Sequence, residues 1–394
     1  MKNTMMIFLF LMLIFWGCEE HAETQPEENV SSFDFELFKT IESSEMRDNF
    51  MVSPLSISLA LSMAYNGAER DTKEAFAQVL RNETSLAAFN QSNQEMISRL
   101  SSNTTDSSLS LANSMWIDEG LLVKDAFIGV NEDYYDSEVR NLDLRDPASV
   151  GIISEWVSEK TLGKVKDMLK EIDGILLLIN TVYFNMQWED AFDVEQTHRA
   201  VFYKADNSAL DVDMMSGEGS VPYLENDLFA SIVLPYEGDE FSMVLVLPQE
   251  GKAVGDVAED LAERDRDQWL DAFEDRVVYI EMPKFKMEYT QLLNESLIDM
   301  GLGIAFDEQM ADFSGITARG LYISRVLHST SINVNEAGTE AAAVTVVELR
   351  SLSIPYESKR LILNHPFLFI VKENRTGTFL FMGKVGAPSY GNEG

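Results

Sequence analysis

"NVNEAGTEAAAVTVVELRSLSIP" (residues 333–355) joins two kinds of sequence that rarely follow one another. It opens with Gly338 and the alanines at 341–343, which are poor strand formers. It continues with "VTVV" (residues 344–347), a β-branched run that favours a strand. The stretch therefore raises a question: it is either a permanent buried strand or a loop that is able to become one.

The alternation of side chains along this stretch fits insertion into a sheet. Successive residues of a strand point to opposite faces. One face would carry only uncharged residues, namely Thr339, Ala341, Ala343, Thr345, Val347 and Leu349. The opposite face would hold every charge, namely Glu340, Glu348 and Arg350. No proline falls between Thr339 and Leu352, so each backbone N–H is free to pair. We predict a loop that can insert as a strand; a permanent strand followed by a turn fits the small residues less well.

The chain is strongly acidic. Its 394 residues contain 30 Lys+Arg against 66 Asp+Glu, a formal net charge of −36. Such a charge repels polyanions and so argues against nucleic acid, heparin-like polymers and anionic lipid as partners. We interpret it as a solubilising acidic surface, and the alternative is attraction of basic partners.

The N-terminus has the pattern of an export signal. Lys2 precedes "MMIFLFLMLIFWGC" (residues 5–18), an apolar run too short to span a bilayer comfortably. Cys18, the single cysteine of the chain, closes this run after Gly17. This arrangement resembles a bacterial lipoprotein box, whose cysteine is lipidated; the alternative is an ordinary signal peptide. We expect residues 1–17 to be removed and Cys18 to carry a lipid.

Residues 18–30 are polar and are expected to form a flexible tether. The acidic pair Glu19-Glu20 resembles surface-export signals of some Gram-negative lipoproteins. We therefore expect an exported protein, held at a bacterial membrane by its lipid anchor alone and facing the cell surface or the extracellular side. With a single cysteine, no internal disulfide can form.

Helical patterns dominate the first half of the chain. Ser53-Pro54 is a helix N-cap followed by proline at the first helical position, and Gly67 marks the end of that helix. Further helices are predicted near residues 33–47, 70–80, 85–100, 125–136 and 148–161.

Strand patterns dominate the second half. Strands are predicted within residues 174–185, 229–236, 241–250, 276–287 (with a bend at Pro283), 321–334 and 366–385. Hairpins are predicted at "EGDE" (residues 237–240) and near residues 373–377. One more helix is predicted at 290–302, stopped by Gly301. Helices first and strands later, interleaved, predict an α+β domain with large antiparallel sheets.

Motifs of catalysis, nucleotide binding and metal binding are absent from the sequence. It contains no G-x-S-x-G, H-E-x-x-H, P-loop or paired C-x-x-C. The histidines at 21, 198, 328 and 365 lack metal-ligand spacing. We expect no cofactor, no metal and no enzymatic activity, and a catalytic role for His328 is disfavoured because no activated nucleophile stands near it in the sequence.

The opening stretch resembles the hinge and reactive loop of a serpin, and "NVNEAGTEAAA" (residues 333–343) is the specific match. The resemblance extends over residues 31–389, with further motifs in family order. These motifs are "NFMVSPLSISLALSMAYNGA" (49–68), "NTVYFNMQWEDAF" (180–192), "PKFKMEYTQLLNESLIDMGLGIAFDEQMADFSGI" (283–316), "LYISRVLHSTSINVNEAGTEAAA" (321–343) and "NHPFLFIVKENRTGTFLFMGKVGAP" (364–388). The resemblance implies a single domain over residues 31–390, with three β-sheets, eight or nine helices and an exposed reactive loop.

The resemblance also implies a mechanism. A serpin offers its loop to a protease, is cleaved, and holds the protease as an acyl-enzyme while the loop inserts into the main sheet. Losing one oxyanion-hole donor costs a protease about 3–4 kcal/mol in the transition state. Distorting several such contacts should make deacylation very slow. We therefore expect a suicide-substrate inhibitor of serine proteases, with cysteine proteases as secondary targets.

Family spacing from Gly338 places the reactive bond between Leu352 and Ser353. Leu352 would fill the specificity pocket of a chymotrypsin-like, cathepsin G-like or elastase-like protease. The alternative is a shorter register with the bond between Arg350 and Ser351, which would suit a trypsin-like protease.

The resemblance further assigns residues to the hinge and to the control of sheet opening. The hinge residues are Glu336, Gly338, Thr339, Ala341, Ala342 and Ala343. The sheet-opening residues are Ser53, Ser56, Asn180, Trp188, Lys284 and His328. A salt bridge between Lys284 and Glu336 is expected to hold the loop outside the sheet until cleavage.

Two further expectations concern partners. The region matching the heparin-binding helix, near residues 85–100, holds only Arg99 against Glu95, so no heparin-like cofactor is expected. We expect a monomer whose partner is the target protease. The alternatives are a non-inhibitory binding or storage protein on the same fold and, less well supported, a hydrolase with an unrecognised nucleophile.

Overall fold

The structure is a computed structural model that describes residues 32–102, 108–161, 163, 169–172, 174–339 and 358–391. Several predicted features lie outside these residues. They are the signal peptide at 1–17, Cys18 and the tether at 18–30, the hinge alanines Ala341, Ala342 and Ala343, and both candidate reactive bonds, Leu352–Ser353 and Arg350–Ser351.

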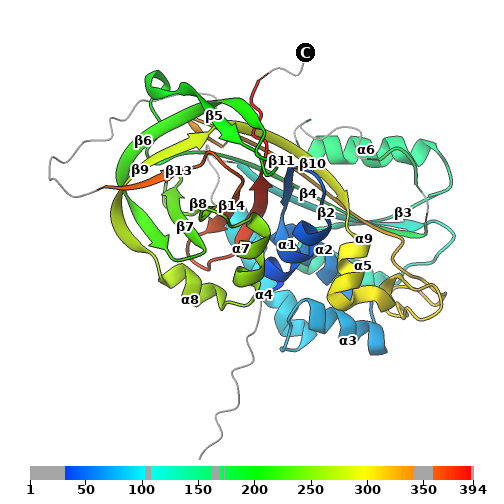
Figure 1. Cartoon of the computed structure of the whole chain (residues 1–394). Helices are drawn as coiled ribbons and strands as arrows, with labels where there is room; N and C mark the ends of the chain where they lie inside the picture. The colour runs from blue at the N-terminus through cyan, green and yellow to red at the C-terminus, as the bar shows by residue number, and fades with distance from the viewer. Residues whose placement is uncertain are drawn as a thin grey trace, which may run out of the picture.

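A six-stranded sheet forms the centre of the site described below (Figure 1). Its strands, in spatial order, are β10 (Phe285–Leu292), β11 (Arg325–Asn335), β12 (Gly338–Thr339), β4 (Leu176–Gln187), β2 (Ser108–Asp118) and β3 (Glu138–Leu142). Strands β11 and β4 are parallel and pair directly, from Arg325 opposite Leu177 to Ser331 opposite Tyr183. Beyond that point the short strand β12 lies between them.

A second ladder of nine strands carries the rest of the described sheet structure. It runs β1 (Asn49–Val52), β15 (Phe379–Val385), β14 (Phe367–Glu373), β8 (Phe241–Pro248), β7 (Phe229–Pro235), β6 (Ala209–Glu225), β9 (Glu274–Pro283) and β13 (Lys359–Ile362), with β5 (His198–Tyr203) beside β6. The long strand β6 pairs with β5 near its start and with β7 at its end. Through β6, two of the three sheets expected for a serpin join into one hydrogen-bonded ladder.

Nine α-helices lie within the described residues. They are α1 (Phe33–Ser44), α2 (Pro54–Tyr65), α3 (Arg70–Val79), α4 (Leu86–Ser102), α5 (Asp125–Tyr135), α6 (Ala148–Lys160), α7 (Val254–Ala262), α8 (Arg266–Asp271) and α9 (Asn294–Leu297). Single turns occur at Val194–Gln196, Ile298–Leu302 and Gly303–Phe306. Helix α2 starts as predicted, because Ser53 Oγ accepts a hydrogen bond of 3.2 Å from the Ser56 N–H.

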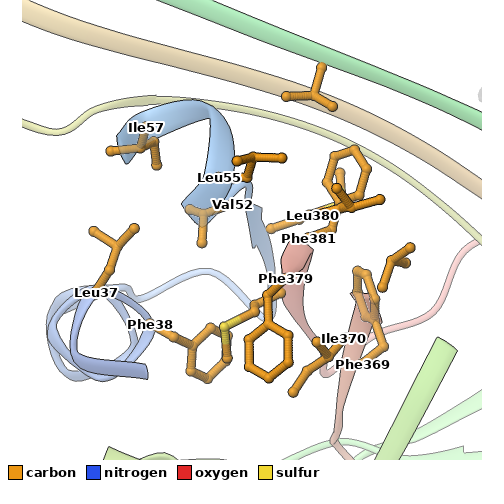
Figure 2. Close-up of a cluster of buried hydrophobic side chains, with 14 of the residues drawn as sticks. Leu37, Phe38, Val52, Leu55, Ile57, Phe369, Ile370, Phe379, Leu380 and Phe381 are labelled. Carbon is orange, nitrogen blue, oxygen red and sulfur yellow. The ribbon is translucent and has the colours of Figure 1, made fainter. Parts of the chain in front are cut away.

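Two apolar cores hold the helices against the sheets. The larger one packs α1 and α2 against β14 and β15, and Figure 2 shows this region with Phe38 and Phe379 near its middle. The smaller core lies on the opposite face of the six-stranded sheet, where Trp156 of α6 contacts Trp116 of β2 edge to face. Helix α2 is buried on all sides, so it forms a fixed support behind the sheet. No helix among the described residues combines the length and apolarity that crossing a bilayer requires.

The α+β architecture agrees with the prediction, but some elements differ. Strands β1, β2 and β3 were not predicted in the first half of the chain. The helix expected at 290–302 was wrong at its start, because Thr290–Leu292 belongs to β10. There, pairing with Leu327–Ser329 of β11 outweighs the local helical pattern. The helical portion is limited to α9 and the turn that follows it.

Candidate functional site

The site is the gap between β11 and β4, which β12 already enters at one end. Gly338 pairs with Asn335 of β11 and Gln187 of β4, and Thr339 pairs with Val334 and Met186. Gly338 has φ +152°, and a Cβ at this position would lie 2.2 Å from the Met186 carbonyl oxygen. Only glycine can pass so close to β4 in this conformation.

Thr339 is the first residue on the face that the sequence predicts to be uncharged, and it is fully buried. Its Oγ1 lies 2.7 Å from the hydroxyl of Tyr236, which follows β7 and is also buried. Burial raises the pKa of the Tyr236 hydroxyl, so it stays protonated. The buried Thr339 hydroxyl therefore has a hydrogen-bond partner inside the protein, which offsets the loss of water from it.

Trp188 lies at the end of β4, beside the entry point. Its indole Nε1–H donates to the Asn335 carbonyl oxygen at 3.0 Å, and its backbone N–H donates to the Ala337 carbonyl oxygen at 2.9 Å. The indole ring stacks on Tyr236 with centroids 4.5 Å apart and an interplanar angle of 9°. Trp188 thus supports the turn between β11 and β12 through both its backbone and its side chain.

Glu336, in that same turn, is held from several sides. Its carboxylate forms a salt bridge with Lys284, with Nζ 3.0 Å from Oε2. The Thr197 hydroxyl donates to Oε1 at 2.8 Å. The Glu336 carbonyl oxygen accepts from the Phe192 N–H at 2.9 Å. We call Lys284, Thr197 and Glu336 the hinge clamp.

The hinge clamp contains the predicted salt bridge. Lys284 and Glu336 are paired, and Gly338 and Thr339 lie between β11 and β4. Because Glu336 lies in the turn that precedes β12, the bridge fixes the start of that strand. The expected role of the bridge, to hold the loop outside the sheet until cleavage, concerns residues 340–357, which lie outside the described residues and leave it a prediction.

A second cluster lies farther along the same gap, where β11 and β4 pair directly. We call Ser53, Ser56, Asn180 and His328 the gate cluster. The Ser53 backbone N–H donates to His328 Nε2 at 2.9 Å, and the Ser56 hydroxyl donates to Asn180 Oδ1 at 3.3 Å. His328 Nδ1 contacts the same Asn180 oxygen. The four residues therefore link the start of α2 to both strands that insertion would separate.

The electrostatic state of His328 follows from its burial. The residue is fully buried, and loss of hydration lowers its pKa from 6.5 to about 3. The neutral ring accepts at Nε2 from a main-chain N–H, which leaves Nδ1–H to donate to Asn180. Its Nε2 lone pair is thus occupied by a backbone N–H.

Asn180 and Gln187 are seven residues apart on β4, about 23 Å of strand. Asn180 belongs to the gate cluster, and Gln187 pairs with Gly338 beside the hinge clamp. Both groups therefore lie along the boundary between β4 and β11, which we call the seam. His328 and Asn180 are also register partners in the β11–β4 pairing. A strand inserted between β11 and β4 would move them from one strand spacing to two, about 4.8 to about 9.6 Å, and would break their side-chain contact.

The structure brings every described sheet-opening residue of the prediction to this seam. It also adds contacts that sequence reasoning missed, made by Thr197, Tyr236, Asn335 and Tyr390. No local signal could have found them, because Tyr236 and Thr339, for example, are 103 residues apart in the chain. Among the described residues, no cluster of metal-ligating side chains occurs.

Comparison with known proteins assigns the chain to a family. A model of the family described as serpin (serine protease inhibitor) matches residues 28–388. The chain belongs to the serpin family, whose members are generally protease inhibitors rather than enzymes.

Three relatives show how far the similarity extends. An uncharacterized serpin-like protein of Methanosarcina mazei is 34% identical, with 97% of each chain covered. The native structure of tengpin, a thermophilic serpin, is 33% identical with a TM-score of 0.85, covering 91% of this chain and 93% of tengpin. Human thyroxine-binding globulin, solved as a complex with thyroxine, is 27% identical with a TM-score of 0.83, covering 91% of this chain and 97% of the globulin.

Proposed function

We propose that this protein inhibits serine proteases as a suicide substrate, with cysteine proteases as secondary targets. After cleavage, the loop that follows Thr339 inserts between β11 and β4 while the protease remains bound as an acyl-enzyme. The observation that carries the proposal is β12 itself, since Gly338 and Thr339 already pair with both strands of the gap. A sheet that accepts the first two residues in this register is suited to accept those that follow.

The energetics of insertion support this mechanism. Residues 340–349 continue the alternation that Thr339 begins, and none is a proline. About ten new ladder hydrogen bonds, at a net gain of about 1 kcal/mol each, would exceed the loss of the gate-cluster contacts. The buried position of Thr339 supports the register in which uncharged side chains enter the interior.

We infer that the reactive bond is Leu352–Ser353 and that the target is chymotrypsin-like or elastase-like. Arg350–Ser351 is the alternative bond, with a trypsin-like target. Denaturing gels of the residue 19–394 fragment mixed with chymotrypsin, and separately with trypsin, test this. A denaturant-stable complex that releases a peptide beginning at Ser353 supports the first assignment, and a peptide beginning at Ser351 supports the second. Clean cleavage without a complex would count against inhibition of these proteases.

We also propose that the protein is an exported bacterial lipoprotein, anchored through Cys18 and facing the cell surface. The apolar run at 5–17 followed by the single cysteine supports this. Radiolabelled palmitate should label the wild-type protein in an expressing bacterium and should not label Cys18→Ser. Equal labelling of both proteins would exclude lipidation at Cys18.

A small-molecule binding protein on the same fold is the second candidate. A solvent-open hollow whose walls include the apolar side chains of Trp188, Phe192 and Ile280 favours it. Proteolytic nicking of the loop separates the two functions. A suicide inhibitor should melt at a much higher temperature after nicking, because the loop inserts. A binding protein whose loop does not insert should melt at nearly the same temperature.

A further inference from the structure

The C-terminal segment reaches the hinge clamp by a route that the proposed mechanism does not use. The side chain of Asn49 fixes the start of this segment, because its Oδ1 accepts from the N–H groups of Gly386 and Ala387, each at 2.8 Å. Asn49 Nδ2 also donates to the Ala387 carbonyl oxygen at 2.7 Å. The segment, red in Figure 1, then runs beside β10, where the Lys286 N–H donates to the Ser389 carbonyl oxygen at 2.8 Å.

This path places Tyr390 on Lys284. The Lys284 ammonium lies 4.3 Å from the centroid of the Tyr390 ring. The same ammonium forms the 3.0 Å salt bridge with Glu336. Lys284 follows the last residue of β9 and precedes β10, where the chain passes from one sheet to the other, and its own N–H donates to the Asp213 carbonyl oxygen at 2.9 Å. Its backbone is thereby fixed, and its ammonium contacts both the aromatic ring and the carboxylate.

We propose that Tyr390 is a positioning residue that holds Lys284 against Glu336 and so keeps the hinge seated at the top of the gap. An aromatic face attracts a cation. It also excludes water from one side of the ammonium, which strengthens the attraction of Lys284 for Glu336. The C-terminal segment thus acts on the hinge through Lys284 and makes hinge position depend on the end of the chain. The expected effect of Tyr390 on protease inhibition rests on the proposed function, but its effect on the position of the hinge does not.

A loop-mimicking peptide measures hinge position without any protease. The probe is a fluorophore-labelled peptide with the sequence of residues 338–352, whose first two residues compete with Gly338 and Thr339 for their positions between β11 and β4. We expect Tyr390→Leu to incorporate this peptide about threefold faster than the wild type, because loss of the cation–π contact loosens the hinge. Tyr390→Phe keeps the ring and should match the wild type. Tyr203→Leu is the matched control, since Tyr203 is a similarly exposed tyrosine on β5.

Lys284→Met provides the decisive background. If Tyr390 acts through Lys284, Lys284→Met alone should speed incorporation, and Tyr390→Leu should add nothing to it. The midpoint of urea unfolding gives a second measure, which Tyr390→Leu should lower only when Lys284 is present. A wild-type rate in Tyr390→Leu, equal effects of Leu and Phe, or a full effect in the Lys284→Met background would each overturn the proposal.

Protease assays keep the two proposals distinguishable. If the protein is an inhibitor, Tyr390→Leu should also raise the number of inhibitor molecules consumed per trapped protease. If no protease is trapped but Tyr390→Leu still speeds peptide incorporation, the proposed function fails and the role of Tyr390 stands. If proteases are trapped equally well by both proteins and the incorporation rates are equal, the proposed function stands and the role of Tyr390 fails.

Discussion

The hydroxyl of Tyr236 and the hydroxyl of Thr339 lie 2.7 Å apart inside the protein, although the two residues come from separate parts of the chain. Tyr236 in turn stacks on Trp188, whose backbone and indole N–H groups both hold the turn before Thr339. The interior thus offers a specific polar partner to Thr339, the last hinge residue that the structure describes. If Thr339 contacted the interior only by accident, as part of a surface loop, no buried tyrosine hydroxyl would be needed to pair with it.

Replacing Thr339 with valine tests that relationship. Valine keeps the shape but leaves the buried Tyr236 hydroxyl without its partner, which should cost about 1–3 kcal/mol in the free energy of unfolding. Urea unfolding measures this cost. Combining Thr339→Val with Tyr236→Phe removes both hydroxyls, so the double variant should lose less than the sum of the two single variants. Additive losses would show that the two hydroxyls are not coupled.

The close passage of Gly338 leads to a second prediction. In Gly338→Ala, the added Cβ would meet the Met186 carbonyl oxygen at 2.2 Å, and the backbone would keep a φ of +152° that alanine avoids. We expect the hinge to leave the gap, which should expose the amides of residues 338 and 339 to rapid hydrogen exchange. Gly320→Ala is the control, because a Cβ there meets nothing within 4 Å. Slow exchange at both amides in Gly338→Ala would contradict the prediction.

The alternation of the loop leads to a third prediction, at residues outside the described structure. Ala343 falls on the face that Thr339 begins, so Ala343→Arg should place a charge in the interior during insertion. The variant should be cleaved by the protease but should no longer trap it on denaturing gels. Glu340→Arg puts the same side chain on the opposite face and should still trap protease. Trapping by Ala343→Arg would count against insertion.

How much of the structure can be predicted from the sequence depends on whether the contacts that form an element are local in the chain. The start of α2 was predictable, because Ser53-Pro54 specifies its own cap within three residues. Strand β2 was missed even though Leu109, Leu111 and Met115 share a face, since the polar Asn113 interrupts that face. Residues 290–292 were assigned to the wrong element because only the presence of β11 makes them a strand.

The residues of the site likewise fall into those that sequence motifs identify and those that only the folded chain brings together. The members of the gate cluster and the pair Lys284–Glu336 were identified from family motifs, and the structure supplies the distances between them. Thr197, Tyr236 and Tyr390 lack any motif, because each reaches the hinge through the folded chain. The partial entry of the hinge was equally hidden, since it depends on how far β11 and β4 separate at one end.

The pKa of His328 leads to a fourth prediction, on pH and stability. Its value of about 3 in the folded protein lies below the ordinary 6.5, so the unfolded chain binds the extra proton more readily. The stability that the folded protein keeps while this ring is neutral is complete above pH 6.5, and it is lost as the pH falls from 6.5 toward 3. Each pH unit in that window should cost about 1.4 kcal/mol, so unfolding at pH 5 should require about 2 kcal/mol less than at pH 7.

Two histidine-to-glutamine variants separate the effect of His328 on stability from the titration of other groups. In His328→Gln, the amide can accept from the Ser53 N–H and donate to Asn180, but it does not titrate. Urea unfolding between pH 5 and 7 should therefore show a much flatter pH dependence in this variant. His198→Gln is the control, because it makes the same substitution at an exposed histidine outside the gate cluster. An unchanged slope in His328→Gln would mean that other groups cause the acid sensitivity, and that the gate cluster does not weaken as the pH falls.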